Sequence, residues 1–274
     1  MQIESSIAQA RGAAASLTRP AALVPTMGAL HAGHLSLISA ARRECASVAA
    51  SLYVNPLQFG AGEDFERYPR DFKADKKLFE QAGVDLLFAP SADAMLPQDY
   101  STYVDVASVA ARFEGEKRPG HFRGVATVVA KLLEIMRPDV IYLGQKDAQQ
   151  TAVVRRMVRD LELGVEVRIV PTVREPDGLA LSSRNVYLSA QERSAAPSLN
   201  VSLQRVQALL ENGVDKGSAI AQASQILKPP GVLEYLDVVD ADTFEPVEHL
   251  RPPAFIIGAA RFGKTRLLDN LWIN

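Results

Sequence analysis

The sequence is poor in cysteine, in long hydrophobic runs and in excess charge of either sign. Its one cysteine, Cys45, forms no intramolecular disulfide, so covalent cross-links do not hold the fold together. No stretch approaches 18 uninterrupted apolar residues, and we therefore expect no membrane-spanning helix and no membrane partner. Lys and Arg number 30 against 32 Asp and Glu, for a net charge of −2. Such a chain has no overall positive field to recruit nucleic acid.

The N-terminus also lacks the basic start of a secretory signal. MQIESSIAQARGAAASL carries an acid at Glu4, and its pattern indicates an amphipathic helix. We accordingly expect a cytoplasmic protein. With 274 residues, of which 47% are hydrophobic, the chain can build one large domain or two smaller ones.

Short apolar runs alternate with helical patterns through the first 170 residues, which predicts βαβ units and a parallel sheet. Runs such as SVAASLYV are continuously apolar, as expected for parallel strands buried on both faces. We therefore predict an α/β fold with a Rossmann-like parallel sheet. The predicted strands are 21–25, 48–54, 84–89, 139–143 and 165–170, and the predicted helices are 35–45, 71–82, 124–136 and 147–161.

The composition changes after Pro171, where a polar loop begins. Helices over roughly 190–212 and 216–228, the break LKPPG and two or three short strands predict a smaller α+β domain. We place the first domain at 1–172 and the second at 173–274, and expect the second to cover the active site.

The strongest local motif is PTMGALHAGHLSL, which begins at Pro25 and holds two of the four histidines. An apolar strand runs into a turn at Gly28, and a helix is predicted to begin near Gly33 or His34. A helix N-terminus attracts anions, and a glycine lets a nucleotide lie close. His31 and His34 can direct ring N–H donors at phosphate oxygens. A zinc pair or two surface histidines are the alternatives, although zinc needs three or four ligands.

Two more polar segments, NPLQFG and LGQKD, also follow predicted strands. Ligands gather at the carboxyl ends of such strands, so we expect the three segments to meet in one crevice. Lys146 suits a phosphate and Asp147 suits ribose hydroxyls; the alternative is a solvated lysine beside a helix cap. Ser182, Ser183 and Arg184 suit a triphosphate, although an ordinary connecting loop has the same composition.

GAARFGKT, which ends at Thr265, matches the P-loop expression of nucleotide triphosphatases. A P-loop needs a long helix after the Lys-Thr pair and further strands beyond it. The remaining RLLDNLWIN is too short for these, so we predict a strand, a turn and a closing strand instead.

These motifs together with RPGHFRGV and PTVREPDGLALSSRN closely resemble the pantothenate synthetase (pantoate–β-alanine ligase) family. His-x-Gly-His alone would indicate only the wider group of nucleotidyltransferases and class I aminoacyl-tRNA synthetases. The resemblance implies a two-step reaction that requires ATP and Mg2+. Pantoate and ATP form pantoyl adenylate and pyrophosphate, and β-alanine then displaces AMP to give pantothenate.

The resemblance also implies a role for individual residues. His34 matches the proton donor, and His31, Lys146 and Arg184 complete the catalytic set. Gln58 and Gln150 match the amides that hold pantoate, and glutamine both donates and accepts without adding charge. The implied ATP-binding residues are Met27, Gly28, Ala29, Leu30, His31, Ala32, Gly33, His34, Gly144, Gln145, Lys146, Asp147, Val173 (through its backbone), Leu181, Ser182, Ser183 and Arg184.

The chain departs from the family at Gln145, where glutamate is common, and we expect a small effect. Weaker candidates for the mouth of the substrate site are Asn55, Arg118, His121 and Arg123.

The family further implies a homodimer. No Mg2+ ligands are assigned, because Mg2+ prefers phosphates and water to a protein cage.

The adenylate must be kept from water, and the loop at 60–71 is the predicted lid.

The rival functions are a nucleotidyltransferase that stops after adenylylation and a non-catalytic nucleotide sensor. The slight excess of acidic over basic residues disfavours a third alternative, a fragment of an aminoacyl-tRNA synthetase.

Overall fold

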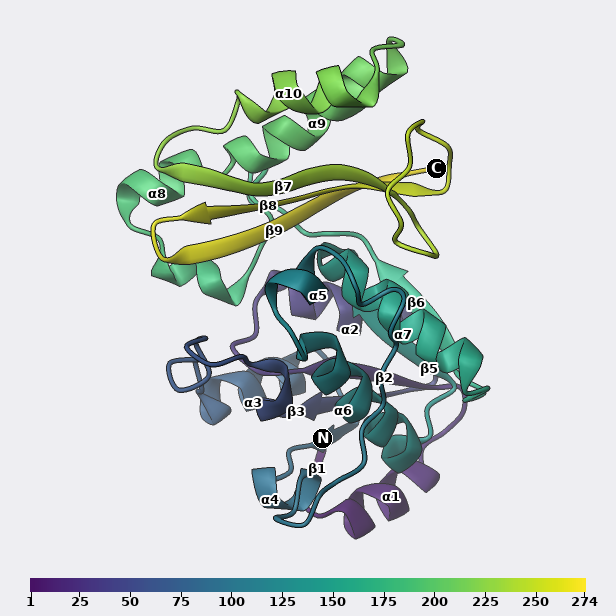
Figure 1. The fold of residues 1–274 in the computed structure, drawn as a ribbon. Helices are drawn as coiled ribbons and strands as arrows, with labels where there is room; N and C mark the ends of the chain where they lie inside the picture. Colours follow the sequence, from purple (N-terminus) through teal and green to yellow (C-terminus); the bar gives the residue numbers. More distant parts are fainter. The chain divides into compact units, whose positions relative to one another are not determined.

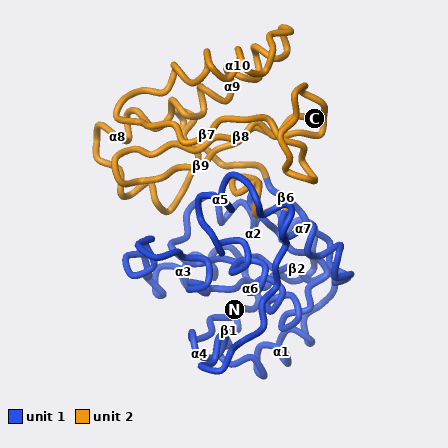
Figure 2. The backbone as a smooth tube through the Cα atoms, viewed as in Figure 1, with its two compact units in different colours: residues 1–144, 153–170 blue, residues 145–152, 171–274 orange.

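The computed structural model describes all of residues 1–274, which form two compact units (Figure 2). Unit 1 comprises Met1–Gly144 and Val153–Val170, and unit 2 comprises Gln145–Ala152 and Pro171–Asn274. The short stretch from 145 to 152 therefore belongs to unit 2 although it precedes the end of unit 1 in the sequence.

Unit 1 is built on a parallel sheet of six strands in the order β1-β4-β3-β2-β5-β6 (Figure 1). Every pair in it is parallel. The fold class predicted from the sequence is confirmed. The strands are β1 (Gln2–Glu4), β2 (Ala21–Thr26), β3 (Ser47–Leu52), β4 (Leu86–Phe88), β5 (Val140–Gly144) and β6 (Glu166–Val170).

Helices cover both faces of this sheet. Ala22, Val24 and Tyr142 join a buried cluster with residues of α2 and α3, while the alternate residues Leu23 and Ile141 are fully buried as well. This double burial explains the continuously apolar strands. The helices are α1 (Ile7–Ala15), α2 (Ala32–Glu44), α3 (Phe72–Gln81), α4 (Ala92–Met95), α5 (Glu114–Lys117), α6 (His121–Met136) and α7 (Ala148–Asp160).

The prediction of one helix over the N-terminal residues was wrong at its beginning. Residues 2–4 form β1, in which Ile3 pairs with Leu87 and packs against the core. A three-residue strand has too few residues for its alternation to stand out from the helical pattern that follows.

Unit 2 contains an antiparallel sheet of three strands in the order β7-β8-β9, against which α9 and α10 pack. The strands are β7 (Gly231–Asp240), β8 (Ala254–Phe262) and β9 (Thr265–Ile273), longer than predicted. The helix predicted over 190–212 is two helices, because Pro197 lacks an N–H and separates them. They are α8 (Ala190–Ala195) and α9 (Ser198–Glu211), followed by α10 (Lys216–Ser224).

The P-loop-like sequence lies in the β8–β9 hairpin, as the strand–turn–strand prediction required. Phe262 pairs with Thr265, and Gly263 turns the chain with a φ of 57°. No helix of the chain is both long and apolar enough to cross a lipid bilayer.

Candidate active site

Three polar segments begin at one edge of the unit 1 sheet. β2 ends at Thr26, β3 at Leu52 and β5 at Gly144, and β2 lies between the other two. Since the strands are parallel, their carboxyl ends lie at the same edge, where open α/β sheets bind ligands. The segments that leave this edge contain the His-x-Gly-His, NPLQFG and LGQKD motifs.

The turn after β2 is held in an unusual conformation by a buried carboxylate. Gly28 and Ala29 have φ values of 88° and 51°, a region that alanine rarely adopts. Asp75, on α3, is 3% exposed. Its two carboxylate oxygens accept the N–H groups of Ala29 at 3.0 Å and Leu30 at 2.8 Å. A Cβ at Gly28 would lie 2.8 Å from the Asp75 carboxylate, so the turn needs both residues.

The two histidines of the motif form the N-terminal cap of α2. His31 is the capping residue, and its Nδ1 accepts the N–H of Gly33 at 3.1 Å. The Nδ1 of His34 accepts the N–H of His31 at 3.4 Å, which completes a reciprocal capping box. Because Nδ1 accepts in both rings, the ring proton of each neutral histidine is on Nε2. The ring centroids lie 4.2 Å apart, so two N–H donors come together at one helix terminus.

The cap fixes the start of this helix and shows a structural role for Gly33. α2 begins at Ala32, one residue before the predicted start. The close approach of a nucleotide to Gly33 stays a prediction, and the glycine also has a structural role. A Cβ there would lie 2.9 Å from Nδ1 and Cε1 of His31, so glycine makes room for the capping ring.

Gln58 is oriented by its neighbours in the 3-10 turn η1 (Pro56–Gln58) that follows β3. The amide nitrogen of Asn55 donates to Oε1 of Gln58 at 3.0 Å and to the carbonyl of Gly124 at 3.1 Å. Asn55 is 2% exposed. With Oε1 engaged in this way, the Gln58 side chain is presented as an N–H donor, which suits a carboxylate ligand.

Arg118, which caps the end of α5, and His121, the first residue of α6, hold the backbone carbonyl of Gln58. His121 Nδ1 donates to this oxygen at 2.8 Å and Arg118 at 3.2 Å. Arg118 also binds both carboxylate oxygens of Glu63 at 2.7 Å. Burial, together with the charge of Arg118, lowers the pKa of His121 from 6.5 to about 4, so the ring is neutral at physiological pH. Burial opposes ionisation of Glu63, but Arg118 holds the pKa of that carboxyl below its usual value.

These contacts give the weaker candidates a structural role. Asn55, Arg118 and His121 all contact Gln58, and their place at the substrate mouth stays a prediction. Arg123 lies outside this group, and its guanidinium stacks 4.2 Å from the centre of the Tyr103 ring.

In unit 2, Gln145, Lys146 and Asp147 form the 3-10 turn η2 (Gln145–Asp147). The Lys146 ammonium lies 3.0 Å from a carboxylate oxygen of Asp147. Asn270, on β9, donates to the backbone carbonyls of Gln145 and Lys146, both at 2.9 Å. The turn that presents Lys146 is therefore held by the last strand of the chain.

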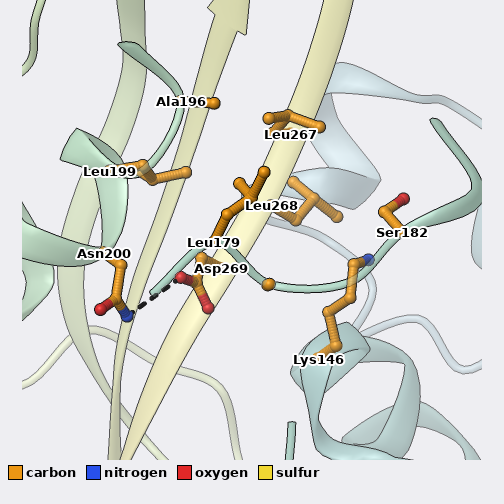
Figure 3. A pocket seen from close by; sticks show the side chains of 10 residues that line it. Lys146, Leu179, Ser182, Ala196, Leu199, Asn200, Leu267, Leu268 and Asp269 are labelled. Atoms are coloured by element: carbon orange, nitrogen blue, oxygen red, sulfur yellow. Dashed lines mark hydrogen bonds between the residues drawn. The ribbon is translucent and has the colours of Figure 1, made fainter. Parts of the chain in front are cut away.

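The second predicted phosphate segment lies in the same unit. Leu181 donates its N–H to the carbonyl of Val173 at 3.0 Å, which closes the loop that precedes Ser182. Ser182 caps the 3-10 turn η3 (Ser183–Tyr187) by accepting the N–H of Arg184 at 3.2 Å. Lys146 and Ser182 line one pocket of unit 2 with Asn200 and Asp269 (Figure 3). The structure thus brings the lysine and the serine segment together.

Two further predicted residues, Gly144 and Gln150, take no part in the hydrogen bonds described above. Gly144 is the last residue of β5, and Gln150 is half-buried in the first turn of α7. The role of Gln150 at pantoate stays a prediction. No group of three or more His, Cys, Asp or Glu side chains is arranged to hold a metal ion.

Comparison with known proteins identifies the family. The sequence pattern of the pantoate–β-alanine ligases matches residues 2–272. The chain belongs to the pantoate–β-alanine ligase family. A curated ligase of this family, the pantothenate synthetase of Heliobacterium modesticaldum, is 53% identical over 259 residues, which cover 92% of this chain and 91% of the relative.

Solved structures of ligases from this family share the fold. Pantothenate synthetase from Thermus thermophilus is 48% identical, covers 99% of both chains and superposes with a TM-score of 0.94. The pantoate–β-alanine ligase of Francisella tularensis, solved with β-γ ATP and β-alanine, is 34% identical with a TM-score of 0.81. It covers 99% of this chain and 97% of its own.

Proposed function

We propose that this chain carries out the ligase reaction of its family with the residues described above. The reaction joins pantoate to β-alanine, with ATP converted to AMP and pyrophosphate. The observation that carries the proposal is the histidine capping box, because it places two Nε2–H donors at a helix N-terminus that itself favours anions.

In the first step, a carboxylate oxygen of pantoate attacks the α-phosphate of ATP, and the bond to pyrophosphate breaks. His31 and His34 donate hydrogen bonds as charge develops on the leaving phosphates, and His34 supplies a proton. Lys146, Ser182, Ser183 and Arg184 are the further groups that we propose for the phosphates of ATP. Stabilising charge that develops in the transition state is often the largest contribution to catalysis.

In the second step, the amine nitrogen of β-alanine bonds to the acyl carbon of pantoyl adenylate, the bond from that carbon to the phosphate oxygen of AMP breaks, and the nitrogen releases a proton to water as AMP leaves. Gln58 and Gln150 hold the pantoyl group, and the contact with Asn55 directs the Gln58 amide N–H toward it. No lysine or arginine is needed there, because pantoate is not phosphorylated.

Mg2+ fits the site as a partner of the ATP phosphates, where it would neutralise their charge. The carboxylate beside the motif, Asp75, already accepts two backbone N–H groups. Phosphate oxygens and water are the ligands that Mg2+ commonly keeps in nucleotide sites. We accordingly assign it no protein ligand.

We also propose the remaining features expected from the family. The ligase would act in the cytoplasm as a homodimer. Residues 1–172 would bind ATP and pantoate, residues 173–274 would contribute the serine segment, and the loop at 60–71 would act as a lid.

The deciding experiment measures AMP and pyrophosphate released from ATP and Mg2+, with pantoate or β-alanine omitted in turn. We expect pyrophosphate to require pantoate, and AMP to accumulate only when β-alanine is present. Pantoate-dependent pyrophosphate without AMP on addition of β-alanine would indicate a nucleotidyltransferase. Folded protein that binds ATP without turnover would indicate a nucleotide sensor.

A further inference from the structure

Two adjacent polar residues interrupt the last strand of unit 2. Asp269 and Asn270 of β9 are 5% and 2% exposed, respectively. Neighbouring residues of a strand point to opposite faces of the sheet, so the two side chains reach different surroundings. Buried polar groups of this kind need partners, and each of these two has several.

The Asn270 side chain is bonded to the turn that carries the catalytic lysine. Its amide nitrogen donates to the carbonyls of Gln145 and Lys146, both at 2.9 Å. Its amide oxygen accepts the side-chain N–H of Gln145 at 3.1 Å. Both amide protons and the oxygen are therefore engaged, and the contact fixes the backbone from which the Lys146 side chain extends.

Asp269 is bonded to the loop that leads to the serine segment. Its carboxylate accepts two hydrogen bonds from the Arg174 guanidinium, at 2.6 and 2.8 Å. Asn200 donates to it as well, at 3.2 Å, and this bond is drawn in Figure 3. Arg174 in turn donates to the carbonyl of Gly178 at 3.0 Å. Arg174 also pairs with Ala180, two residues before Ser182.

We propose that Asp269 and Asn270 are positioning residues that set the two phosphate-binding segments of unit 2 relative to each other. Asn270 fixes the position of Lys146. Asp269 fixes the position of Ser182 through Arg174 and the closed loop. Neither residue contacts ATP in this scheme, and the inference depends on the proposed roles of Lys146 and Ser182 at the phosphates. The two segments are attached to adjacent residues of one strand. A substitution that shifts either attachment therefore changes the distance between the segments.

The test uses substitutions that keep shape and change hydrogen bonding. Asn270→Asp replaces the amide donor with a carboxylate that faces two carbonyl oxygens, and Asp269→Asn removes the charge paired with Arg174. We expect each to lower the rate of pantoate-dependent exchange between pyrophosphate and ATP by about 10²-fold, the loss typical of a reacting group displaced by 1 Å. The KM for β-alanine should not change.

Two control variants make the same chemical changes elsewhere in unit 2. Asn212→Asp removes an amide donor to a backbone carbonyl, that of Ala208, at the end of α9. Asp237→Asn removes the carboxylate paired with Lys216. Both should retain the wild-type exchange rate. Equal losses in the controls would indicate a general effect on stability and would overturn the proposal.

A double-mutant cycle separates positioning from folding. If Asn270 acts through Lys146, Asn270→Asp should cost less than about 3-fold once Lys146→Ala is present, because coupled residues are not additive. Additive losses would overturn the proposal, as would an unchanged exchange rate in Asn270→Asp. Absence of exchange in the wild type would instead contradict the proposed function. A wild-type exchange rate in Lys146→Ala would show that this lysine has no role in the first step.

Discussion

His31 caps α2 with one nitrogen of its ring, and the proposed contact with ATP uses the other. Nδ1 accepts the Gly33 N–H and caps α2, while Nε2 is the donor proposed for ATP. Asparagine is among the best residues at this capping position and has no counterpart to Nε2. Stability and catalysis should therefore respond separately to substitution at position 31.

We expect His31→Asn to retain the thermal stability of the wild type but to lose about 10²–10³ in kcat, as removal of one well-placed donor often does. His31→Ala should lose activity and, in addition, about 1 kcal/mol of stability through loss of the cap. Steady-state kinetics and thermal unfolding of the two variants check this. Near-normal turnover in His31→Asn would show that the ring has no part in catalysis.

His121 should titrate well below the usual range of a histidine. Burial lowers its pKa to about 4 in the folded protein, against 6.5 for the free side chain. Between these values the unfolded chain binds a proton that the folded one does not, so stability falls as pH drops through this window. The loss should reach about 3 kcal/mol at its lower end. NMR titration of the imidazole resonances, assigned with His121→Gln, gives the pKa directly; a value near 6.5 would contradict the burial described here.

Substitution of Asp75 tests whether the turn after β2 needs the buried carboxylate of this residue. Asp75→Asn leaves one oxygen for two N–H groups, and we expect about a 10-fold rise in the KM for ATP, as one charged hydrogen bond is worth roughly 1.5–3 kcal/mol. Asp71→Asn is the matched control on α3, since Asp71 caps the helix and asparagine caps equally well. An unchanged KM in Asp75→Asn would mean that the turn keeps its shape without this support.

At the scale of elements, the sequence predicted the central strands and long helices well because their patterns are local. β2 and α6 are continuous apolar or amphipathic segments within a few residues of their predicted bounds. The break between α8 and α9 was missed because a proline within a helical pattern also occurs in a first turn. β1 was missed because its partner β4 lies far away along the chain, beyond any local pattern.

The β8–β9 hairpin provides a test at this scale. A true P-loop would need its lysine for ATP, whereas in this structure Lys264 is an exposed residue of a two-residue turn. Lys264→Ala should therefore leave kcat and the KM for ATP unchanged. A KM for ATP raised tenfold or more would show that the hairpin binds nucleotide after all.

At the scale of the whole molecule, the candidate site was predictable only where its residues lie in motifs. His31, Lys146 and Ser182 were predicted because each stands in a recognisable segment after a strand or in a polar loop. Asp75, Asp269 and Asn270 carry no local signal, since their partners lie 45 to 125 residues away in the chain. The closing sequence LLDN suggested a strand, but nothing in it indicated which backbone groups it would hold.

The loop at 60–71 gives a test that involves the whole enzyme. Arg67 is exposed within it, while Glu63 is paired with Arg118. If the loop closes over bound ligands, ATP and pantoate together should slow tryptic cleavage after Arg67. Mass spectrometry of the fragments identifies the bond, and Arg67→Gln should abolish that fragment. Equal cleavage with and without the ligands would argue against a lid.

The ring of His31 fills the space that a side chain at position 33 would need. Positions 31 and 33 therefore constrain each other: while the histidine remains, any side chain at position 33 must displace the ring.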